Sequence, residues 1–443
     1  MTHMLADYQL DALIALLGKD AVRTDSHSRH TYGRDWMPVI EPDPVAIVFP
    51  RNAEQVQALL QRANEWHCPL VPSGGRTGLA GGAAALHGEI VVSFEKMNRI
   101  IEVDATERLI LCEPGVITAQ LQQTAREHGL YYPVEFAADG SSQIGGNIAT
   151  NAGGVRVLRY GMTRAQVAGL NVITGHGATI AEMRCLRKDN AGYALRELFV
   201  GSEGTLGMIV LAGLRLQSTP PALATALLLL DDVTALPAVM QAMQAFELHA
   251  CELMDARAWQ WGNAEQSAPL DVPPAALYLL MEAPAESMSA EALARALQHQ
   301  PVSDVLLAQS ATQAERFWAV RESITAALKP QQPFKCDIGF RLACMPAVLA
   351  RMGQQWPDAV VFGHLGDGNL HLNIVNSDDH AITQAKVWQL VKDYNGTITA
   401  EHGVGLLRRD SLQSMEAKAR LQAMQNLKRV FDPNGILNPG KLC

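Results

Sequence analysis

Three glycine-rich loops in the first half of the chain constrain its fold most strongly. Pro72–Ala83 (PSGGRTGLAGGA) carries five glycines in twelve residues and directly follows an apolar, strand-like run. The loops Ser141–Gly161 and Gly201–Ile209 repeat its mixture of glycine, serine and threonine. Glycines let successive backbone N–H groups turn towards one anion and approach it closely. Three such loops inside one α+β unit therefore predict a long polyphosphate ligand held between them.

The spacing of the first loop excludes two common nucleotide-binding motifs. Pro72–Ala83 is neither G-x-x-x-x-G-K-[ST] nor a clean G-x-G-x-x-G, so neither a P-loop nor a nicotinamide Rossmann fingerprint applies. One such loop alone is more often a flexible surface loop. The recurrence of the pattern in three places favours a ligand site.

A proline-rich break at Ser218–Ala222 (STPPA) divides the chain. Before it, strand-like runs alternate with glycine-rich turns, and they lie at Pro44–Pro50, Leu70–Pro72, Glu89–Phe94, Leu109–Cys112 and Leu170–Thr174, with a helix at Asn52–Trp66. After it, the predicted order is strand Ala226–Leu230, helix Val233–Phe246, strands Ala250–Met254 and Leu277–Glu282, helix Ser289–Gln298 and strand Val305–Gln309. That β-α-β-β-α-β order is ferredoxin-like. We expect domains at 1–218 and 219–400, with the segment 401–443 returning to the first.

The composition excludes several classes of partner. The 443 residues are 48% hydrophobic and carry a formal net charge of −9, which argues against a nucleic-acid partner. The sequence contains no run of about 18 apolar residues, so we predict no transmembrane helix. Met1–Lys19 has the pattern of an amphipathic helix rather than that of a signal peptide. The seven cysteines form no C-x-x-C pair, so we expect reduced thiols and a cytoplasmic location.

The stretch Gly363–Asn373 (GHLGDGNLHLN) predicts a tight β-hairpin. Asp-Gly is a favoured centre of a type I′ turn, and a turn centred on Asp367–Gly368 would set His364 directly opposite His371. Opposed residues of an antiparallel pair share a face, with Cβ atoms about 4.5–5.5 Å apart. The hairpin therefore predicts two imidazoles held together on one face.

A second motif, Thr397–Gly405 (TITAEHGVG), supplies Glu401 and His402. If Thr397–Glu401 is a strand, Glu401 and His402 take opposite faces. Glu401 with His364 and His371 forms a catalytic-type zinc set with open positions. The alternative is a hydrogen-bonded polar cluster without metal.

Together with EPGV at Glu113–Val116, these loops and motifs resemble the vanillyl-alcohol oxidase type flavoproteins, and most closely their D-2-hydroxyacid dehydrogenase branch. The resemblance covers about residues 40–443. It implies an α+β fold, with an FAD-binding domain of two α+β subdomains and a ferredoxin-like cap domain that binds substrate. The FAD contacts it implies are Pro72, Ser73, Gly74, Gly75, Arg76, Thr77, Gly78, Gly81, Gly82, Pro114, Gly115, Ser142, Gly145, Gly146, Asn147, Asn151, Gly153, Gly154, Glu203, Gly204, Gly207, Ile209, His402 and Asn438.

The resemblance also implies how each group is held. Some relatives tether the flavin through His or Cys in these loops, but none occurs in 72–83 or 141–161, so we expect non-covalent FAD. His364, His371 and Glu401 match positions that bind a divalent metal, usually zinc, with manganese the other candidate. The substrate positions it implies are Arg321, Thr325, Lys335 and Asn373. Relatives tend to have a small polar residue where Gly339 stands here, which leaves the identity of the acid open.

The favoured function is FAD- and metal-dependent oxidation of a D-2-hydroxy acid, D-2-hydroxyglutarate before others, with hydride passing from C2 to flavin N5. His402 is the expected general base; the alternative role is to orient a ligand or contact the flavin. D-lactate dehydrogenase and the FAD subunit of glycolate oxidase are alternative functions, and a non-catalytic electron-relay subunit is an alternative of another class. We expect a flavoprotein or quinone acceptor, membrane contact only through that acceptor, and a chain compatible with a homodimer.

Overall fold

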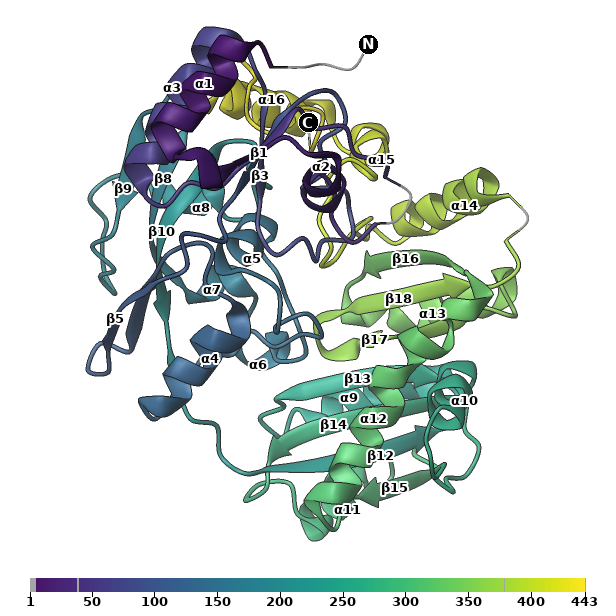
Figure 1. Cartoon of the computed structure of the whole chain (residues 1–443). Coiled ribbons are helices and arrows are strands. Elements are labelled where there is room, and N and C mark those ends of the chain that lie inside the picture. Colours follow the sequence, from purple (N-terminus) through teal and green to yellow (C-terminus); the bar gives the residue numbers. More distant parts are fainter. Residues whose placement is uncertain (1–4, 38–39, 378, 443) are drawn as a thin grey trace. The chain divides into compact units, whose positions relative to one another are not determined.

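The computed structural model describes residues 5–37, 40–377 and 379–442, and these divide into two compact units (Figure 1). The first unit takes in the described residues of Met1–Gly154, Gly161–Thr219 and Glu401–Cys443. The second takes in those of Val155–Tyr160 and Pro220–Ala400. The sequence did not predict that Val155–Tyr160 belongs to the second unit. None of the described helices is both long and apolar enough to cross a membrane.

A mostly parallel sheet opens the first unit. Its order within the described residues is β1-β2-β4-β3, and β2 and β3 both run parallel to β4. Helix α3 begins after Asn52, whose side chain accepts the N–H of Gln55 at 2.9 Å, and it buries an apolar stripe beside α1 (Figure 1). The elements are α1 (Asp7–Leu17), β1 (Val22–Arg23), α2 (Ser26–Tyr32), β2 (Ala46–Val48), α3 (Ala53–Trp66), β3 (Leu70–Ser73) and β4 (Ile90–Ser93).

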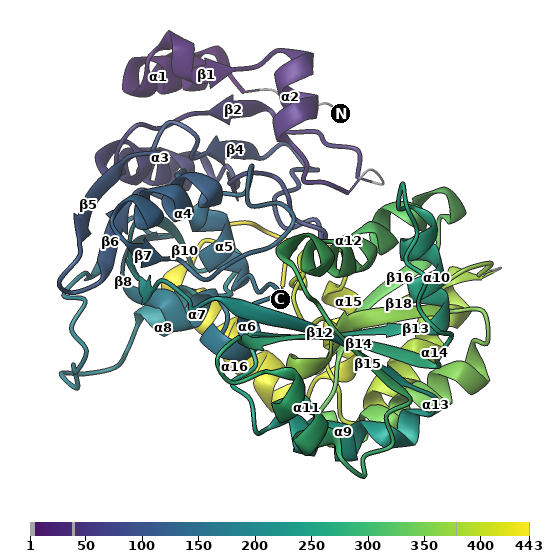
Figure 2. The same ribbon diagram turned by 90° about the horizontal axis from the view of Figure 1, so that it is seen from below.

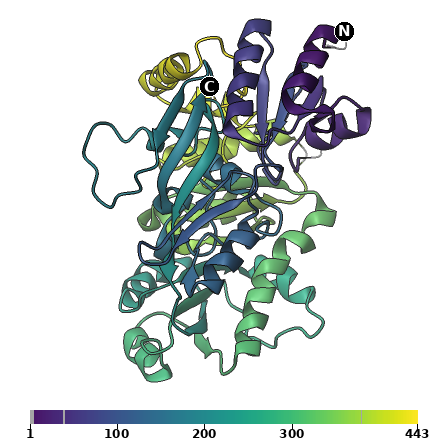
Figure 3. The ribbon, with the colours of Figure 1, turned by 60° about the vertical axis from the view of Figure 1, so that its left-hand side comes forward.

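An antiparallel sheet in the order β5-β6-β10-β8-β9 completes the first unit. The elements of this part are β5 (Ile100–Asp104), β6 (Leu109–Cys112), α4 (Thr118–Glu127), β7 (Leu130–Tyr131), α5 (Ile144–Thr150), α7 (Thr163–Gln166), β8 (Val167–Thr174), β9 (Thr179–Glu182), α8 (Arg196–Phe199), β10 (Gly207–Arg215) and β11 (Gln217–Ser218). Strands β7 and β11 pair with each other in a separate two-stranded sheet. The connection between β9 and α8 projects away from this sheet (Figure 3). Near the C-terminus, α15 (Arg409–Met415) and α16 (Lys418–Phe431) precede Leu437, which forms a parallel bridge with Leu70.

The second unit is built on an antiparallel sheet in the order β15-β12-β14-β13-β17-β18-β16. The β-α-β-β-α-β prediction matches its first four strands, and β12 and β14 lie between β15 and β13 as that topology requires. The elements are α6 (Val157–Tyr160), β12 (Leu223–Leu230), α9 (Leu236–Met243), β13 (Ala250–Asp255), α10 (Ala256–Ala264), β14 (Leu277–Pro284), α11 (Ala290–Leu297), β15 (Asp304–Leu307), α12 (Ala311–Ala327), β16 (Phe334–Gly339), α13 (Met345–Gln355), β17 (Val360–His364), β18 (Asn369–Ile374) and α14 (His380–Asp393).

Helices cover both faces of this sheet. Figure 2 shows α10 and α12 on one face, and α9, α11 and α13 on the other. Beneath α10 and α12 the face is apolar on β12 and β14, where Leu229 pairs with Tyr278 and Leu227 with Leu280. Further along the sheet, the same face becomes polar, and that change marks the site described next.

Candidate active site

The glycine-rich loops of the first unit line one cavity. The lining residues are Asp35, Pro72, Ser73, Gly74, Gly75, Arg76, Thr77, Gly78, Ala80, Gly82, Ala83, Phe94, Pro114, Gln143, Gly145, Gly146, Asn147, Ala149, Thr150, Ser202, Glu203, Gly204, Gly207, Met208, Ile209 and His402. The three loops singled out in the sequence therefore converge on one place. Such convergence suits one long ligand bound by successive backbone N–H groups.

Close backbone approach explains two of the glycines. A Cβ on Gly75 would lie 2.1 Å from the carbonyl oxygen of Ser141, and one on Gly115 would lie 2.0 Å from that of Phe94. Any larger residue at these positions forces the loops apart. The glycines thus allow the loops to pack against one another as well as to approach a ligand.

Asp35 fastens the loop after β3. Its Oδ2 accepts the N–H of Gly81 at 2.7 Å, and its Oδ1 accepts that of Met37 at 3.1 Å. Burial raises the pKa of Asp35, and the N–H groups of Met37, Gly81 and Gly82 oppose that shift. Sequence reasoning missed this residue because it lies outside every glycine-rich segment, 46 positions before Gly81.

Most of the predicted cofactor residues line the cavity. The exceptions are Gly81, Gly115, Ser142, Asn151, Gly153, Gly154 and Asn438. Some of these support the walls: Ser142 Oγ lies 2.7 Å from Thr118 Oγ1, and Asn438 Nδ2 donates to the carbonyl oxygens of Gly82 and Glu203. Direct cofactor contacts from the exceptions stay predictions.

Two buried polar atoms test whether the cavity suits a dinucleotide. Ser73 Oγ and Gln143 Oε1 both lie in the lining, and within the described protein neither has a hydrogen-bond partner. Buried polar groups almost always have one. Hydroxyl and phosphate groups of a dinucleotide would satisfy these two atoms, so the lining fits FAD.

In the second unit, the histidine hairpin forms with a different register from the one predicted. The turn is a 3-10 turn over Leu365–Asp367 followed by Gly368 in the left-handed region (φ 82°), and Phe362, not His364, opposes His371. The side chain of Asp367 accepts the N–H of Asn369 at 3.2 Å, a local bond typical of Asp in turns. The prediction of a type I′ turn centred on Asp367–Gly368 is therefore wrong.

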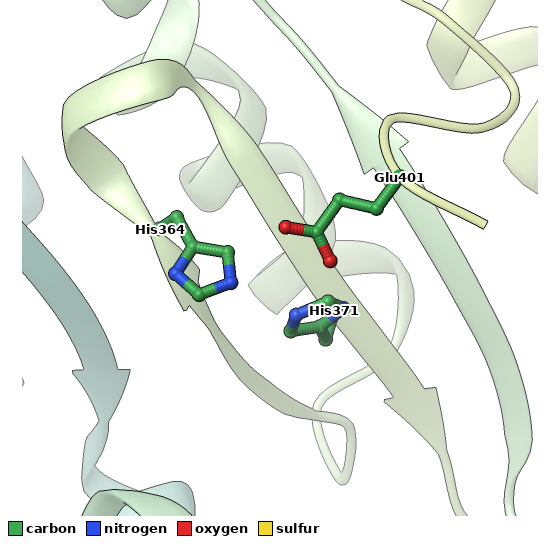
Figure 4. A group of neighbouring side chains, drawn as sticks. All are labelled: His364, His371 and Glu401. Carbon is green, nitrogen blue, oxygen red and sulfur yellow. The ribbon is translucent and has the colours of Figure 1, made fainter. Parts of the chain in front are cut away.

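The two imidazoles nevertheless lie together. His364 is two residues beyond Phe362 and shares its face, so it is a diagonal neighbour of His371. The ring centroids are 5.6 Å apart at 81°. One ligand atom each of His364, His371 and Glu401 lies within 4.8 Å of the others, and Figure 4 shows the three side chains turned towards one another.

Glu252, a residue the sequence reading missed, fixes His364. It opposes His364 across β13 and β17, and its Oε1 lies 2.7 Å from His364 Nδ1. Because a carboxylate only accepts, Nδ1 carries the proton and Nε2 keeps a lone pair for a metal. Burial acts to raise the pKa of Glu252, but His364 and Arg321 outweigh it and hold that pKa below its usual range.

Asp337 lies near the other two members of the cluster, His371 and Glu401. It opposes His371 across β16 and β18, with 3.9 Å between Asp337 Oδ1 and His371 Nδ1. Its Oδ2 accepts the Thr399 hydroxyl and the N–H of Ala400, each at 3.2 Å. Ala400 directly precedes Glu401, so one buried carboxylate faces the second histidine and also holds the backbone next to Glu401.

The segment that carries Glu401 is not a strand, contrary to the sequence prediction. Thr397 forms a single antiparallel bridge with Gly339, after which the chain bends. Glu401 joins the histidine cluster, whereas His402, the next residue, lines the glycine-loop cavity. The predicted divergence of these two side chains therefore arises from a bend, not from strand alternation.

The predicted substrate residues are all in the second unit. Arg321 on α12 is buried, and its Nε and Nη2 each lie 2.8 Å from Glu252 Oε2. Thr325, one turn further along α12, is exposed, as is Lys335. Lys335 pairs with Asn373 across β16 and β18, in the row next to Asp337 and His371. By strand periodicity, Lys335 and Asn373 share the face of the cluster.

Two family models match the chain. The model described as "FAD binding domain" matches residues 44–181, and "FAD linked oxidases, C-terminal domain" matches residues 219–442. A D-2-hydroxyglutarate dehydrogenase of Stutzerimonas stutzeri is 44% identical, with 98% of each chain covered. The enzyme of that name from Xanthomonas citri pv. viticola is 41% identical, covering 95% of this chain and 94% of its own.

The chain belongs to the FAD-linked oxidase family. It is an FAD-dependent oxidoreductase, and the resemblance and fold class predicted from its sequence are confirmed. Among solved structures, 4-ethylphenol oxidase from Gulosibacter chungangensis superimposes with a TM-score of 0.75 at 18% identity, covering 99% of this chain and 98% of that one. An alkyldihydroxyacetonephosphate synthase gives 0.74 at 16% identity, covering 99% and 86%. These two likenesses concern the fold alone.

FAD of this FAD-linked oxidase should be released intact by acid or heat. The described lining residues include no cysteine, and His402 is their single histidine, so tethering would have to occur there. Absorption spectra of supernatant and pellet after acid precipitation check the expectation. Flavin retained in the pellet would contradict it, and its release from a His402→Asn variant would then locate the tether.

Proposed function

We propose that this FAD-linked oxidase oxidises D-2-hydroxy acids to 2-oxo acids, with D-2-hydroxyglutarate as the preferred substrate and a divalent ion, zinc or manganese, held by His364, His371 and Glu401. The observation that carries the proposal is the adjacency of Glu401, in the histidine cluster, to His402, in the cavity lining. A relay subunit needs neither group. The names of the relatives from Stutzerimonas and Xanthomonas support the choice of acid.

The chemistry divides among the chain's own residues. When bound, the ion would lower the pKa of the substrate hydroxyl, and FAD would supply the acceptor for the hydride from C2. His364 offers Nε2 because Glu252 occupies its Nδ1 side. His402 accepts the hydroxyl proton as general base. In this proposal, metal binding falls to Glu401 and proton transfer to the next residue, His402, which faces a different way.

A dicarboxylate is the proposed substrate because two basic side chains lie near the cluster, with the charge of Arg321 already partly offset by Glu252. Arg321 lies against Glu252 beside the cluster, and Lys335 stands two residues from Asp337 on the same strand face. A substrate with one carboxylate needs only one of these partners. D-Lactate and glycolate are therefore expected to be poorer substrates than D-2-hydroxyglutarate.

A dye-coupled assay across D- and L-2-hydroxy acids, with and without chelator, tests the proposed function. D-2-Hydroxyglutarate should give the highest kcat/KM, its L-enantiomer none, and chelator should remove the activity. Preference for D-lactate or glycolate would assign the chain to the alternative function. Indifference to every acid, in a metal-free yellow protein, would favour an electron-relay subunit. The acceptor we propose is another flavoprotein or a quinone, which a panel of acceptors would identify.

Replacing Arg321 by alanine should lower kcat/KM by about 10- to 150-fold, because hydrogen bonds to charged groups contribute about 1.5–3 kcal/mol. It should also destabilise the fold, but by less than the roughly 3–5 kcal/mol of a buried charge left with no partner, because Glu252 keeps its contact with His364. Kinetics and thermal unfolding measure the two effects separately. Arg321→Lys should restore only part of the activity, because an ammonium lacks the planar fork.

Arg316→Ala is the matched control for Arg321, since Arg316 lies on the exposed side of the same helix and bonds only the carbonyl oxygen of Ala268 among the contacts described. Loss of preference for hydroxyglutarate over lactate in Arg321→Ala would assign the guanidinium to the distal carboxylate. Equal losses on both acids would assign it to the carboxylate beside the hydroxyl. Unchanged kinetics on every acid would remove Arg321 from the site.

A further inference from the structure

Glu203, in the loop before β10, joins several segments of the flavin cavity wall. It is 8% exposed and adopts a left-handed backbone (φ 52°). Its N–H donates to the carbonyl oxygen of Ala149 at 2.8 Å, and its own carbonyl oxygen accepts Asn438 Nδ2 at 2.7 Å. Its backbone is therefore held by α5 and by the C-terminal segment, which leaves the side chain a defined direction.

The Glu203 carboxylate is directed at the turn that follows His402. Oε1 accepts the N–H of Val404 at 2.8 Å, and Oε2 accepts the N–H of Gly405 at 2.7 Å. Both oxygens thus bind consecutive amides that begin two residues after His402. Burial raises the pKa of Glu203, while the N–H groups of Val404 and Gly405 oppose the shift.

The same turn packs closely against two neighbours. A Cβ on Gly403 would lie 2.9 Å from Glu203 Oε1, and one on Gly405 would lie 2.2 Å from the carbonyl oxygen of Ala80. Both glycines have positive φ, 77° and 51°. The turn is therefore held between the carboxylate and the loop after β3, and a shift of either partner moves His402.

We propose that Glu203 is a positioning residue: its carboxylate fixes the 403–405 turn and thereby sets His402 at the flavin cavity. The inference deepens the proposed function, because it rests on His402 acting in the oxidation of a 2-hydroxy acid. Glu203 also lines the flavin cavity and is a predicted FAD contact, but both of its carboxylate oxygens bind the protein backbone, so FAD content is a separate readout of the test. Productive geometry is sensitive to such support, and a misplacement of about 1 Å costs roughly 100-fold in rate.

Glu203→Gln tests the proposal, because an amide offers one acceptor oxygen and sets a donor NH₂ against the second backbone N–H. In the FAD-loaded protein, hydrogen exchange of the amides of Val404 and Gly405 should become about 10- to 100-fold faster. Reduction of the flavin by D-2-hydroxyglutarate should slow by about 10- to 100-fold, with KM and FAD content unchanged. Glu203→Asp keeps the carboxylate but has a shorter side chain, so its exchange and flavin-reduction rates should lie between those of the wild type and of Glu203→Gln. It replaces the glutamine variant in the test if that variant does not fold.

Glu182→Gln is the matched control. Glu182 makes the same kind of contact in the same unit, with Oε1 and Oε2 accepting the N–H groups of Leu195 and Arg196 at 3.0 Å each, and it does not line the flavin cavity. Exchange should quicken at Leu195 and Arg196 and stay unchanged at Val404 and Gly405, with normal flavin reduction.

Two results would overturn the proposal: unchanged exchange at Val404 and Gly405 in Glu203→Gln, or faster exchange there with a normal rate of flavin reduction. Loss of FAD with a normal rate in the loaded fraction would make Glu203 a cofactor-binding residue instead. If the wild-type protein oxidises no 2-hydroxy acid, the proposed function fails on its own; the exchange data then still decide whether Glu203 holds the turn.

Discussion

Removing the divalent ion from the FAD-loaded protein is expected to abolish turnover of 2-hydroxy acids while leaving the flavin bound. His364, His371 and Glu401 form the proposed ligand set, and none of them is in the lining of the flavin cavity. A Lewis acid on a reacting oxygen contributes several kcal/mol, and about 4 kcal/mol corresponds to roughly 1,000-fold in rate. Chelation should therefore reduce kcat by at least that factor, with zinc or manganese restoring it.

His371→Ala should reproduce the effect of the chelator, because two remaining ligands hold a divalent ion poorly. The matched control is His380→Ala, which removes an exposed histidine at the start of α14 in the same unit. Elemental analysis measures the metal, and the flavin spectrum measures FAD occupancy. Full turnover by a sample shown to be metal-free would reject the metal assignment.

The fold of the second unit follows closely from local sequence patterns. The predicted strands at Ala226–Leu230, Ala250–Met254 and Leu277–Glu282 correspond to β12, β13 and β14, each extended by a few residues. These strands are apolar runs bounded by turn residues, and helices on both faces bury them. Such runs carry a strong signal because burial on two faces leaves few polar positions.

The histidine hairpin shows why a wrong register still led to the right neighbours. The predicted pairing of His364 with His371 differs from the observed pairing of Phe362 with His371 by two residues. Side chains alternate with period two, so a shift of two keeps the same face, whereas a shift of one would have exposed the histidine on the other face. The sequence therefore predicted that the two histidines share a face, whereas the register of the two strands depended on the 3-10 turn between them.

The two buried carboxylates next to the histidines, Glu252 and Asp337, could not be predicted from local sequence patterns. Glu252 contacts His364 across 112 positions of sequence, and Asp337 contacts Ala400 across 63. The signal that could have found them is a carboxylate inside a mostly apolar strand, as Glu252 is in ACELMD and Asp337 in FKCDIG. A buried strand tolerates such a residue only when a partner lies opposite. The identity of that partner comes from strand order, which the sequence does not state.

Replacing His402 by alanine should slow reduction of the flavin by about 100- to 10,000-fold, the usual contribution of a general base. Metal content should stay near that of the wild type, because the proposed ligand is the neighbouring Glu401, which joins the histidine cluster while His402 lines the cavity. Stopped-flow reduction by D-2-hydroxyglutarate measures the rate, and elemental analysis the metal. His128→Ala, at the exposed C-terminal end of α4, is the matched control in the same unit.

The alternative role of His402, orienting a ligand or contacting the flavin, predicts a different pattern. A merely orienting histidine would change FAD affinity or the flavin spectrum and leave the reduction rate within about tenfold of the wild type, below the range of a lost base. Added imidazole separates the two roles. If His402 accepts the hydroxyl proton, imidazoles should restore part of the rate in His402→Ala, and more basic ones should restore more, because proton transfer follows Brønsted behaviour. A rate insensitive to added base would assign His402 to orientation.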